Sequence, residues 1–173
     1  MGKGTVAAHI REHNPEIHLS VSATTRAPRP GEIDGVHYYF VDDAEFDRLI
    51  AEDELLEYAV VHNRSRYGTP RAPIDAALAA GKTVLLEIDL QGARQVRKAE
   101  PAATLIFLLP PTWDELVQRL VGRGTEGAEE RARRLRTAKV ELAAQNEFDH
   151  LIVNEDVAAA AAEVVELSSS SAR

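Results

Sequence analysis

Apolar and polar positions recur with two different periods along the chain. Apolar residues spaced three or four positions apart predict helices over 2–12, 44–52, 73–80, 91–98, 112–121, 128–144 and 157–167. Strand patterns cover 17–22, 36–41 and 55–61. Nearly continuous apolar runs predict further strands over 83–89, 103–109 and 148–153, of the kind that is buried on both faces of a parallel sheet.

Local signals mark several boundaries between these elements. Asp42 or Asp43 can cap the helix that begins at 44, Thr112 opens a capping box with Glu115, and Gly81 suits the left-handed position after a helix. We expect three irregular segments: a loop rich in Pro, Gly and Arg over 24–35, a polar turn over 63–67 and a disordered tail over 168–173.

Buried strands that alternate with helices predict an α/β fold with a parallel sheet. Residues 22–81 interrupt this alternation with a strand-rich and loop-rich insertion. The length of 173 residues fits one domain with insertions and is too short for two full independent domains.

Composition and charge then narrow the function classes. A chain with 45% hydrophobic and 28% charged residues is an ordinary globular protein. The net charge of −8 argues against nucleic acid or an anionic membrane as the main partner. The absence of cysteine excludes disulfides, cysteine zinc sites and thiol nucleophiles, and the histidines show no metal-ligand spacing. With no secretory signal and no apolar run near the ~18 residues of a membrane span, we expect a cytoplasmic protein.

The sequence Gly2-Lys3-Gly4-Thr5, at the start of a predicted helix, is similar to the second half of a phosphate-binding loop. Glycine lets backbone N–H groups approach phosphate oxygens, the helix N-terminus adds partial positive charge, and lysine reaches the β- and γ-phosphates. Gly4 stands where a hydroxyl would contact Mg²⁺, so Thr5 is the nearest candidate ligand. The alternative is a Gly-Lys pair that occurs by chance.

A second candidate is the proline-stiffened loop that carries Arg26 and Arg29. Two guanidinium groups three residues apart can bind a single phosphate, and the hydroxyl of Tyr38 can add a neutral donor. The alternative is a solvated basic turn in which an arginine pairs with Glu32.

Acidic residues in apolar surroundings form a third candidate. Glu57 lies in an apolar stretch, where a carboxylate can accept two hydrogen bonds from guanine N1–H and N2–H₂; the alternative is an exposed position on an edge strand. Tyr67 and Thr69 supply nearby hydroxyls. Asp89 follows a predicted strand, where open α/β sheets bind ligands, and the alternative is a cap for the next helix.

Arginine is concentrated in one segment near the C-terminal third. Arg119, Arg123, Arg131, Arg133, Arg134 and Arg136 fall within eighteen residues, around glycines 122, 124 and 127. A mobile arginine-rich flap suits a triphosphate during phosphoryl transfer. The alternative is a solvated helix face with Glu–Arg pairs.

Taken together, these motifs resemble the guanylate kinase family. The resemblance covers Gly2 to about Leu167 and rests on SVSATTRAPRPGEIDGVHYYFV, LLEIDLQG, VGRGTEG and LIVNEDV in that order. It implies a P-loop NTPase-like parallel sheet core flanked by helices (1–21, 82–113 and 140–167), a strand-rich GMP-binding insertion (22–81) and a helical lid (114–139).

The resemblance further implies phosphorylation of GMP or dGMP to GDP by ATP, with Mg²⁺. The residues that it assigns to GMP are Ser22, Glu57, Thr69 and Asp89 around guanine, and Arg26, Arg29, Glu32, Tyr38 and Tyr67 around the phosphate. Those that it assigns to ATP are Gly2, Lys3, Gly4, Thr5 and Asn154. Those that it implies for catalysis are Lys3, Arg119, Arg123 and Arg134.

The chain departs from the family at its start. Guanylate kinases begin with an apolar strand that feeds the phosphate-binding loop, whereas this chain begins inside that loop. We therefore expect a truncated chain or a start assigned too late. The alternatives to an active kinase are a catalytically inactive module that binds a partner protein and a truncated form that only binds GMP. A further alternative, a kinase for a different nucleoside monophosphate, is disfavoured by Glu57; adenine, for example, presents an acceptor at N1 where guanine presents a donor.

Overall fold

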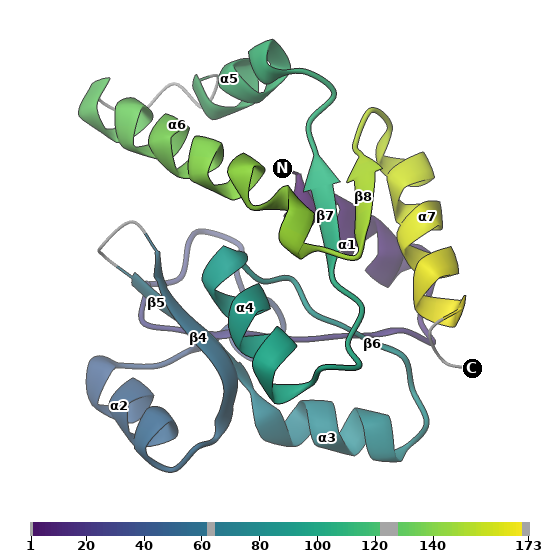
Figure 1. The fold of residues 1–173 in the computed structure, drawn as a ribbon. Coiled ribbons are helices and arrows are strands. Elements are labelled where there is room, and N and C mark those ends of the chain that lie inside the picture. The colour runs from purple at the N-terminus through teal and green to yellow at the C-terminus, as the bar shows by residue number, and fades with distance from the viewer. Residues whose placement is uncertain (1, 62–64, 122–127, 171–173) are drawn as a thin grey trace. The chain divides into compact units, whose positions relative to one another are not determined.

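The structure is a computed structural model that describes residues 2–61, 65–121 and 128–170 (Figure 1). The chain forms two compact units. Unit 1 comprises Met1–Asn14 and Thr104–Arg173, and unit 2 comprises Pro15–Ala103. The predicted division into core, insertion and lid has other boundaries and stays a prediction.

Unit 2 contains a four-stranded sheet in the order β3-β2-β5-β4. Its strands are β2 (Ala23–Thr24), β3 (Tyr39–Phe40), β4 (Leu55–Val61) and β5 (Ser65–Pro70). Strand β5 is antiparallel to both β4 and β2, whereas β2 and β3 are parallel. A separate parallel pair joins β1 (His18–Leu19) to β6 (Val84–Leu85).

Three helices of unit 2 begin or end at the predicted signals. They are α2 (Asp43–Ala51), α3 (Arg71–Ala79) and α4 (Leu90–Ala99). The Asp42 carboxylate caps α2 by accepting from Glu45 N, and Gly81 adopts the left-handed conformation after α3. The core of the sheet and α2 is a cluster of Ala23, Phe46, Leu49 and Leu55. These contacts place α2 against the sheet.

Helix α4 packs along β4, the strand at one edge of the sheet (Figure 1). The side-chain amide of Gln95 on α4 forms two hydrogen bonds with the backbone of Tyr58. Gln95 Oε1 accepts from Tyr58 N at 3.1 Å, and Gln95 Nε2 donates to Tyr58 O at 2.6 Å. Gln95 therefore occupies backbone groups that a neighbouring strand would otherwise use.

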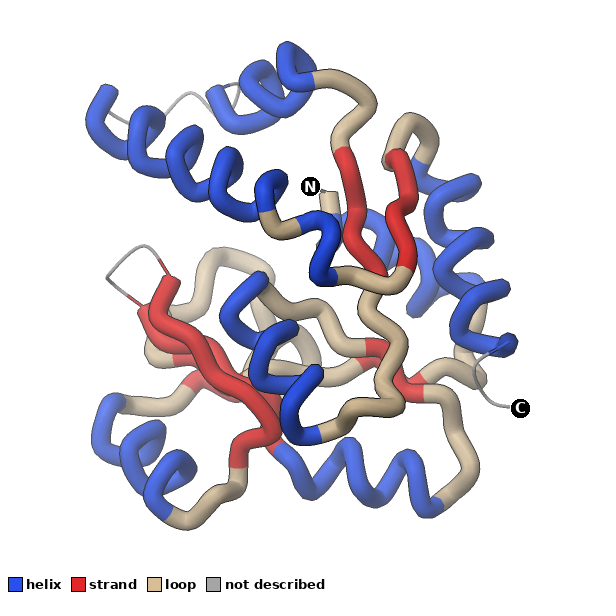
Figure 2. The backbone as a smooth tube through the Cα atoms, viewed as in Figure 1, coloured by secondary structure: helices blue, strands red, loops and turns tan. Residues whose placement is uncertain are grey.

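In unit 1, β7 (Ile106–Leu109) pairs in parallel with β8 (His150–Val153), and a helix lies beside β8 (Figure 2). The helices are α1 (Lys3–His13), α5 (Trp113–Val121), α6 (Ala128–Ala143) and α7 (Val157–Ser170), with a short 3₁₀ helix at Gln145–Glu147. Helix α1 packs against α7. Leu116 and Ala138 join α5 to α6 through a small buried cluster, and Thr112 Oγ1 caps α5 by accepting from Glu115 N.

The parallel pairs and intervening helices confirm the α/β prediction, but several strands differ from it. Residues 63–67 do not form only a turn: β5 begins at Ser65, because its polar side chains are satisfied by hydrogen bonds and ion pairs. The apolar run 83–89 gives only the two-residue strand β6, and β7 is half-buried rather than fully buried. Within the described residues β6 and β7 each belong to a two-stranded sheet, so each strand is hydrogen-bonded to a neighbouring strand along one edge only.

Helix α7 extends past its predicted end at residue 167. The hydroxyls of Ser168 and Ser169 both donate to Val165 O, which extends the helix to Ser170. Residues 171–173 lie outside the described part. Across the described residues we find no helix whose length and apolar character would let it cross a membrane.

Candidate functional site

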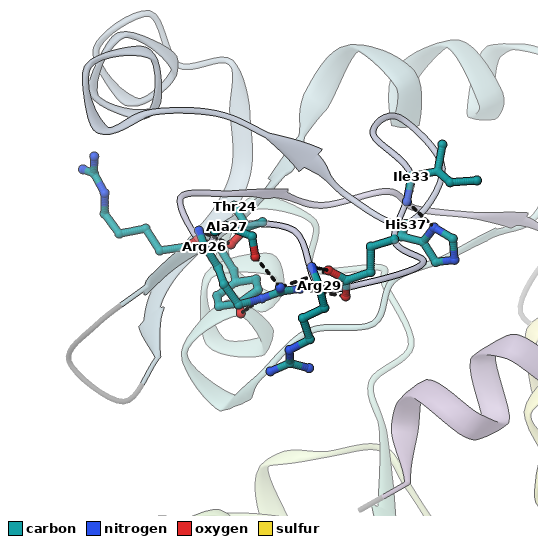
Figure 3. Close-up of polar contacts among 9 residues, drawn as sticks. Thr24, Arg26, Ala27, Arg29, Ile33 and His37 are labelled. Atoms are coloured by element: carbon teal, nitrogen blue, oxygen red, sulfur yellow. Dashed lines mark hydrogen bonds and ion pairs between the residues drawn. The ribbon is translucent and has the colours of Figure 1, made fainter.

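Arg26, two residues after β2, forms hydrogen bonds with its own loop and with strand β5; Figure 3 shows Arg26 together with Thr24, Ala27 and Arg29 of this loop. Its Nη1 and Nη2 donate to the two carboxylate oxygens of Glu32 at 3.0 and 2.9 Å. Its Nε donates to Tyr67 Oη at 3.2 Å, and Nη1 also donates to Ala27 O at 2.6 Å. A guanidinium has five N–H donors, so these contacts leave one N–H on Nη2.

Aromatic rings complete the surroundings of this guanidinium. The Cζ of Arg26 lies 5.2 Å from the ring centroid of Tyr38 and 5.8 Å from that of Phe40. The Tyr38 and Tyr67 rings meet edge to face at 5.9 Å. Burial, followed by the charge of Glu87, raises the pKa of Tyr38, so its hydroxyl stays a donor at neutral pH. We call Arg26, Glu32, Tyr38 and Tyr67 the arginine cluster.

Arg29 contributes differently from Arg26. Its backbone N–H donates to Glu32 Oε2 at 2.7 Å, while its exposed side chain extends away from that carboxylate (Figure 3). The hydrogen bonds from Arg26 and then from Arg29 N lower the pKa of Glu32, which is therefore ionised. The pairing of Arg26 with Glu32 matches the alternative of a paired basic turn, although the aromatic enclosure does not resemble an open turn.

Glu57 on β4 is a buried carboxylate, 4% exposed, opposite Thr69 on β5. The Thr69 hydroxyl donates to Glu57 Oε1 at 2.6 Å. Burial raises the pKa of Glu57 to about 7, the hydrogen bond from Thr69 opposes this, and the charge of Asp89 adds to it. The alternative of an exposed carboxylate is therefore wrong, although β4 is an edge strand of the sheet.

Asp89 lies beside Glu57 at the start of α4. Its Oδ1 accepts from Gly92 N at 2.8 Å, so it caps the helix as the structural alternative predicted. Gly92 in turn lies against Glu57: a Cβ built on Gly92 would overlap Glu57 Oε2. We call Glu57, Thr69, Asp89 and Gly92 the Glu57 cluster.

Strand β5 connects the two clusters. Tyr67 and Thr69 are two residues apart on it, so their side chains share one face, about 7 Å apart along the strand. Ser22 directly precedes β2, where its carbonyl accepts from Tyr39 N at 2.9 Å. The structure thus places Glu57, Tyr67 and Thr69 on strands of one sheet of unit 2, with Ser22, Arg26 and Tyr38 within two residues of its strands.

The residues predicted for ATP lie in unit 1. Gly2 adopts a left-handed conformation (φ 97°) as the N-cap of α1, and its carbonyl accepts from Thr5 N and Val6 N at 3.1 Å. A Cβ on Gly2 would overlap the side chain of Asn154, a residue that is 2% exposed after β8. Gly2 and Asn154 are therefore close together, as one ATP site would require.

The exposed side chains of Lys3 and Thr5, with Gly4 between them, lie in the first turn of α1. The described residues contain no group of three acidic, histidine or cysteine side chains that could hold a metal. Mg²⁺ in kinases takes few protein ligands and fills its shell with phosphate oxygens and water. A single exposed hydroxyl at Thr5 fits that requirement.

The structure describes the predicted lid arginines only in part. Arg134 lies half-buried on α6, and Arg119 lies on α5 without a described side chain. Arg123 and the glycines at 122, 124 and 127 fall outside the described residues. Their assignment stays a prediction.

Two residues at or beside these clusters are not among those predicted from the sequence. Phe40 lies next to Arg26, and Gly92 touches Glu57. A glycine in the first turn of a helix, just after a capping aspartate, indicates a close contact, because alanine is the better helix former there. Phe40 has no such signal, since aromatic residues are ordinary in strands.

Comparison with known proteins agrees with the resemblance. A family model described as guanylate kinase matches residues 1–170. Guanylate kinase from Leifsonia xyli subsp. xyli is 73% identical over 167 residues, which span 96% of this chain and 66% of that protein. Guanylate kinase from Thermobifida fusca is 63% identical over 157 residues, or 91% of this chain and 80% of that protein.

Comparison with solved structures identifies the same family. The crystal structure of guanylate kinase from Anaplasma phagocytophilum matches 97% of this chain and 81% of that chain, with a TM-score of 0.81 and 35% identity. The predicted P-loop NTPase-like α/β fold is thereby confirmed. The chain belongs to the guanylate kinase family, which phosphorylates GMP with ATP.

Proposed function

We propose that this chain phosphorylates GMP to GDP with ATP, that unit 2 binds GMP and that unit 1 binds the ATP phosphates. The observation that carries the proposal is the placement of two clusters on β5. The Thr69 hydroxyl donates a hydrogen bond to the buried carboxylate of Glu57, and the hydroxyl of Tyr67, two residues away on the same strand, accepts one from Arg26. A nucleoside monophosphate offers matching groups, a base at one end and a phosphate at the other.

Glu57 would determine the choice of base. Guanine presents hydrogen-bond donors at N1 and N2, whereas adenine presents an acceptor at N1, which would face the lone pairs of the carboxylate. A buried group left without a partner costs on the order of 1–3 kcal/mol, and more when charged. Asp89, whose charge acts on Glu57, and Ser22 would complete the guanine site.

The arginine cluster would bind the phosphate of GMP. Arg26 has an N–H left on Nη2, and the hydroxyls of Tyr38 and Tyr67 can donate to a phosphate oxygen. Because Glu32 neutralises Arg26, the uncompensated charge would come from the exposed side chain of Arg29. Glu32 would then act by orienting Arg26 rather than by contacting GMP.

In unit 1 the ATP phosphates would lie against the first turn of α1, where backbone N–H groups and Lys3 supply positive charge. Thr5 would hold Mg²⁺, which when bound neutralises phosphate charge. Gly4 and Gly2 would allow the backbone to approach, and Asn154 would lie near the adenine. Arg119, Arg123 and Arg134 would stabilise the charge of the phosphoryl group in transfer. The cytoplasmic location and dGMP as a second substrate are part of the same proposal.

Calorimetric titration with GMP, AMP and ATP, followed by a coupled assay of ADP formation, tests the proposal. We expect GMP and ATP to bind, AMP to bind at least tenfold more weakly than GMP (~1.4 kcal/mol), and ADP to form only when GMP, ATP and Mg²⁺ are all present. Binding of GMP without turnover would indicate a form that only binds the substrate. Absence of nucleotide binding would instead favour a module that binds a partner protein.

A further inference from the structure

The carboxylate of Glu57 rests against the backbone of α4 at Gly92. Gly92 is the third residue of that helix, and its N–H is already taken by Asp89 Oδ1. It is not one of the glycines with positive φ among the described residues. The backbone conformation therefore does not require glycine, and alanine would be the better helix former.

Lack of room for a side chain, rather than backbone conformation, explains why residue 92 is glycine. A Cβ on Gly92 would overlap Glu57 Oε2 and lie 2.9 Å from Glu57 Cδ. The next neighbour, the Cβ of Ile88, would lie at 3.2 Å, which small shifts can relieve. Position 92 is thus closed to a side chain mainly by the carboxylate of Glu57.

We infer that Gly92 is a positioning residue that determines base specificity. The absence of a Cβ lets the Glu57 carboxylate lie between the Thr69 hydroxyl on one oxygen and the first turn of α4 on the other. This inference rests on the proposed function, because it gives the Glu57 carboxylate the task of reading guanine. A side chain at 92 would force the carboxylate out of that orientation and away from Thr69.

The first experiment compares Gly92→Ala with Gln91→Ala, an exposed neighbour in the same turn. For Gly92→Ala we expect the KM for GMP to rise about tenfold and the GMP-to-AMP ratio of kcat/KM to fall by a similar factor, consistent with one misplaced buried hydrogen-bonding group. We expect kcat at saturating GMP to change less than threefold. Gln91→Ala should leave all three values unchanged.

A double-mutant cycle separates positioning from general damage to the helix. With Glu57→Ala in the background, Gly92→Ala has no carboxylate to displace. We then expect no further rise in the KM for GMP and a higher melting temperature, because alanine favours the helix. With Glu57 present, the same change should lower the melting temperature.

The outcomes distinguish this inference from the proposed function. If the wild-type chain binds no GMP, the proposed function fails before the variants are tested. If it binds GMP and Gly92→Ala leaves the KM and the base preference unchanged, the inference about Gly92 is wrong. An equal effect of Gly92→Ala with and without Glu57 would also overturn it.

Discussion

At the residue scale, Glu57 is a position where the stability of the fold and the proposed binding of GMP make opposite demands on one side chain. The side chain is buried, and its carboxylate accepts a hydrogen bond from the Thr69 hydroxyl. With the pKa raised by burial to about 7, the folded state holds the proton more tightly than the unfolded chain, whose ordinary value is 4.5. This stabilising contribution is fully present below pH 4.5 and is lost as the pH rises to 7.

Glu57→Gln should therefore stabilise the protein at alkaline pH. Glutamine keeps an oxygen for the Thr69 hydroxyl and removes the buried charge. At pH 8 we expect a gain of about 1–3 kcal/mol in the free energy of unfolding, and little gain at pH 4.5. Denaturant titrations at the two pH values measure it. The same variant should lose its preference for GMP over AMP; an equal gain at both pH values would contradict the role of charge burial.

Glu32→Gln tests whether Glu32 orients Arg26 or competes with the phosphate of GMP. We expect orientation, because the carboxylate accepts from both terminal guanidinium nitrogens of Arg26 and from the Arg29 N–H. The affinity for GMP should then fall about three- to tenfold, while guanosine, which lacks the phosphate, should bind as before. Calorimetry with both ligands measures this. Tighter binding of GMP would show that Glu32 competes with phosphate.

Residue identities could be predicted better than their contacts. Arg26, Tyr67, Glu57 and Thr69 could be assigned to candidate sites because short motifs indicate which groups their side chains can bind. It could not show that Glu32 accepts from both terminal nitrogens of Arg26, since that depends on how the loop folds back. Nor could it show that Gly92 meets Glu57, a contact across 35 residues of chain between a helix and a strand.

At the scale of elements, β5 shows how ion pairs can replace an apolar pattern. Arg66 donates to Asp47 Oδ1 at 2.6 Å and to Asp43 Oδ1 at 3.0 Å, and its Cζ lies 4.6 Å from the ring centroid of Phe46. One arginine thus joins β5 to both exposed aspartates of α2 while covering an aromatic core residue. The hydrophobic pattern misses such a strand because its partners lie on another element.

Arg66→Met should loosen α2 from the sheet. Methionine keeps an apolar stem over Phe46 but removes the ion pairs, so we expect the melting temperature to fall by roughly 2–4 °C, less at high salt. Arg48→Met is the matched control: Arg48 also has several acidic partners, but its side chain is 40% exposed against 21% for Arg66. Differential scanning calorimetry should show a smaller shift for Arg48→Met. Equal shifts would mean that joining two elements adds nothing.

Helices could be predicted well from the sequence, and strands less well. Caps at Asp42, Thr112 and Gly81 are local, so helix boundaries follow from a few neighbouring residues. Strands such as β2 and β6 are only two residues long and depend on partners far along the chain. Long-range pairing is a property that no local pattern contains.

At the scale of the whole molecule, the two units divide the predicted chemistry between them. All residues assigned to GMP belong to unit 2, and all described residues assigned to ATP belong to unit 1. GMP is therefore expected to affect unit 2, and ATP to affect unit 1.

Hydrogen exchange of the intact chain should show this division. GMP alone should slow amide exchange mainly around β2, β5 and the first turn of α4, and ATP alone should slow it mainly around Gly2–Thr5, because bound ligands suppress local opening. AMP at the same concentration is the control for the base in unit 2. Protection of unit 1 by GMP alone, with none in unit 2, would contradict the assignment.

The contact of Gln95 with Tyr58 has a consequence for solubility. Tyr58 and Val60 are exposed large side chains on the edge strand β4, an arrangement that invites a strand from another copy of the chain. The amide of Gln95 imitates a peptide group at that edge and ends the hydrogen-bonded ladder within the molecule. One glutamine on a helix thus helps to protect the protein against aggregation through its sheet.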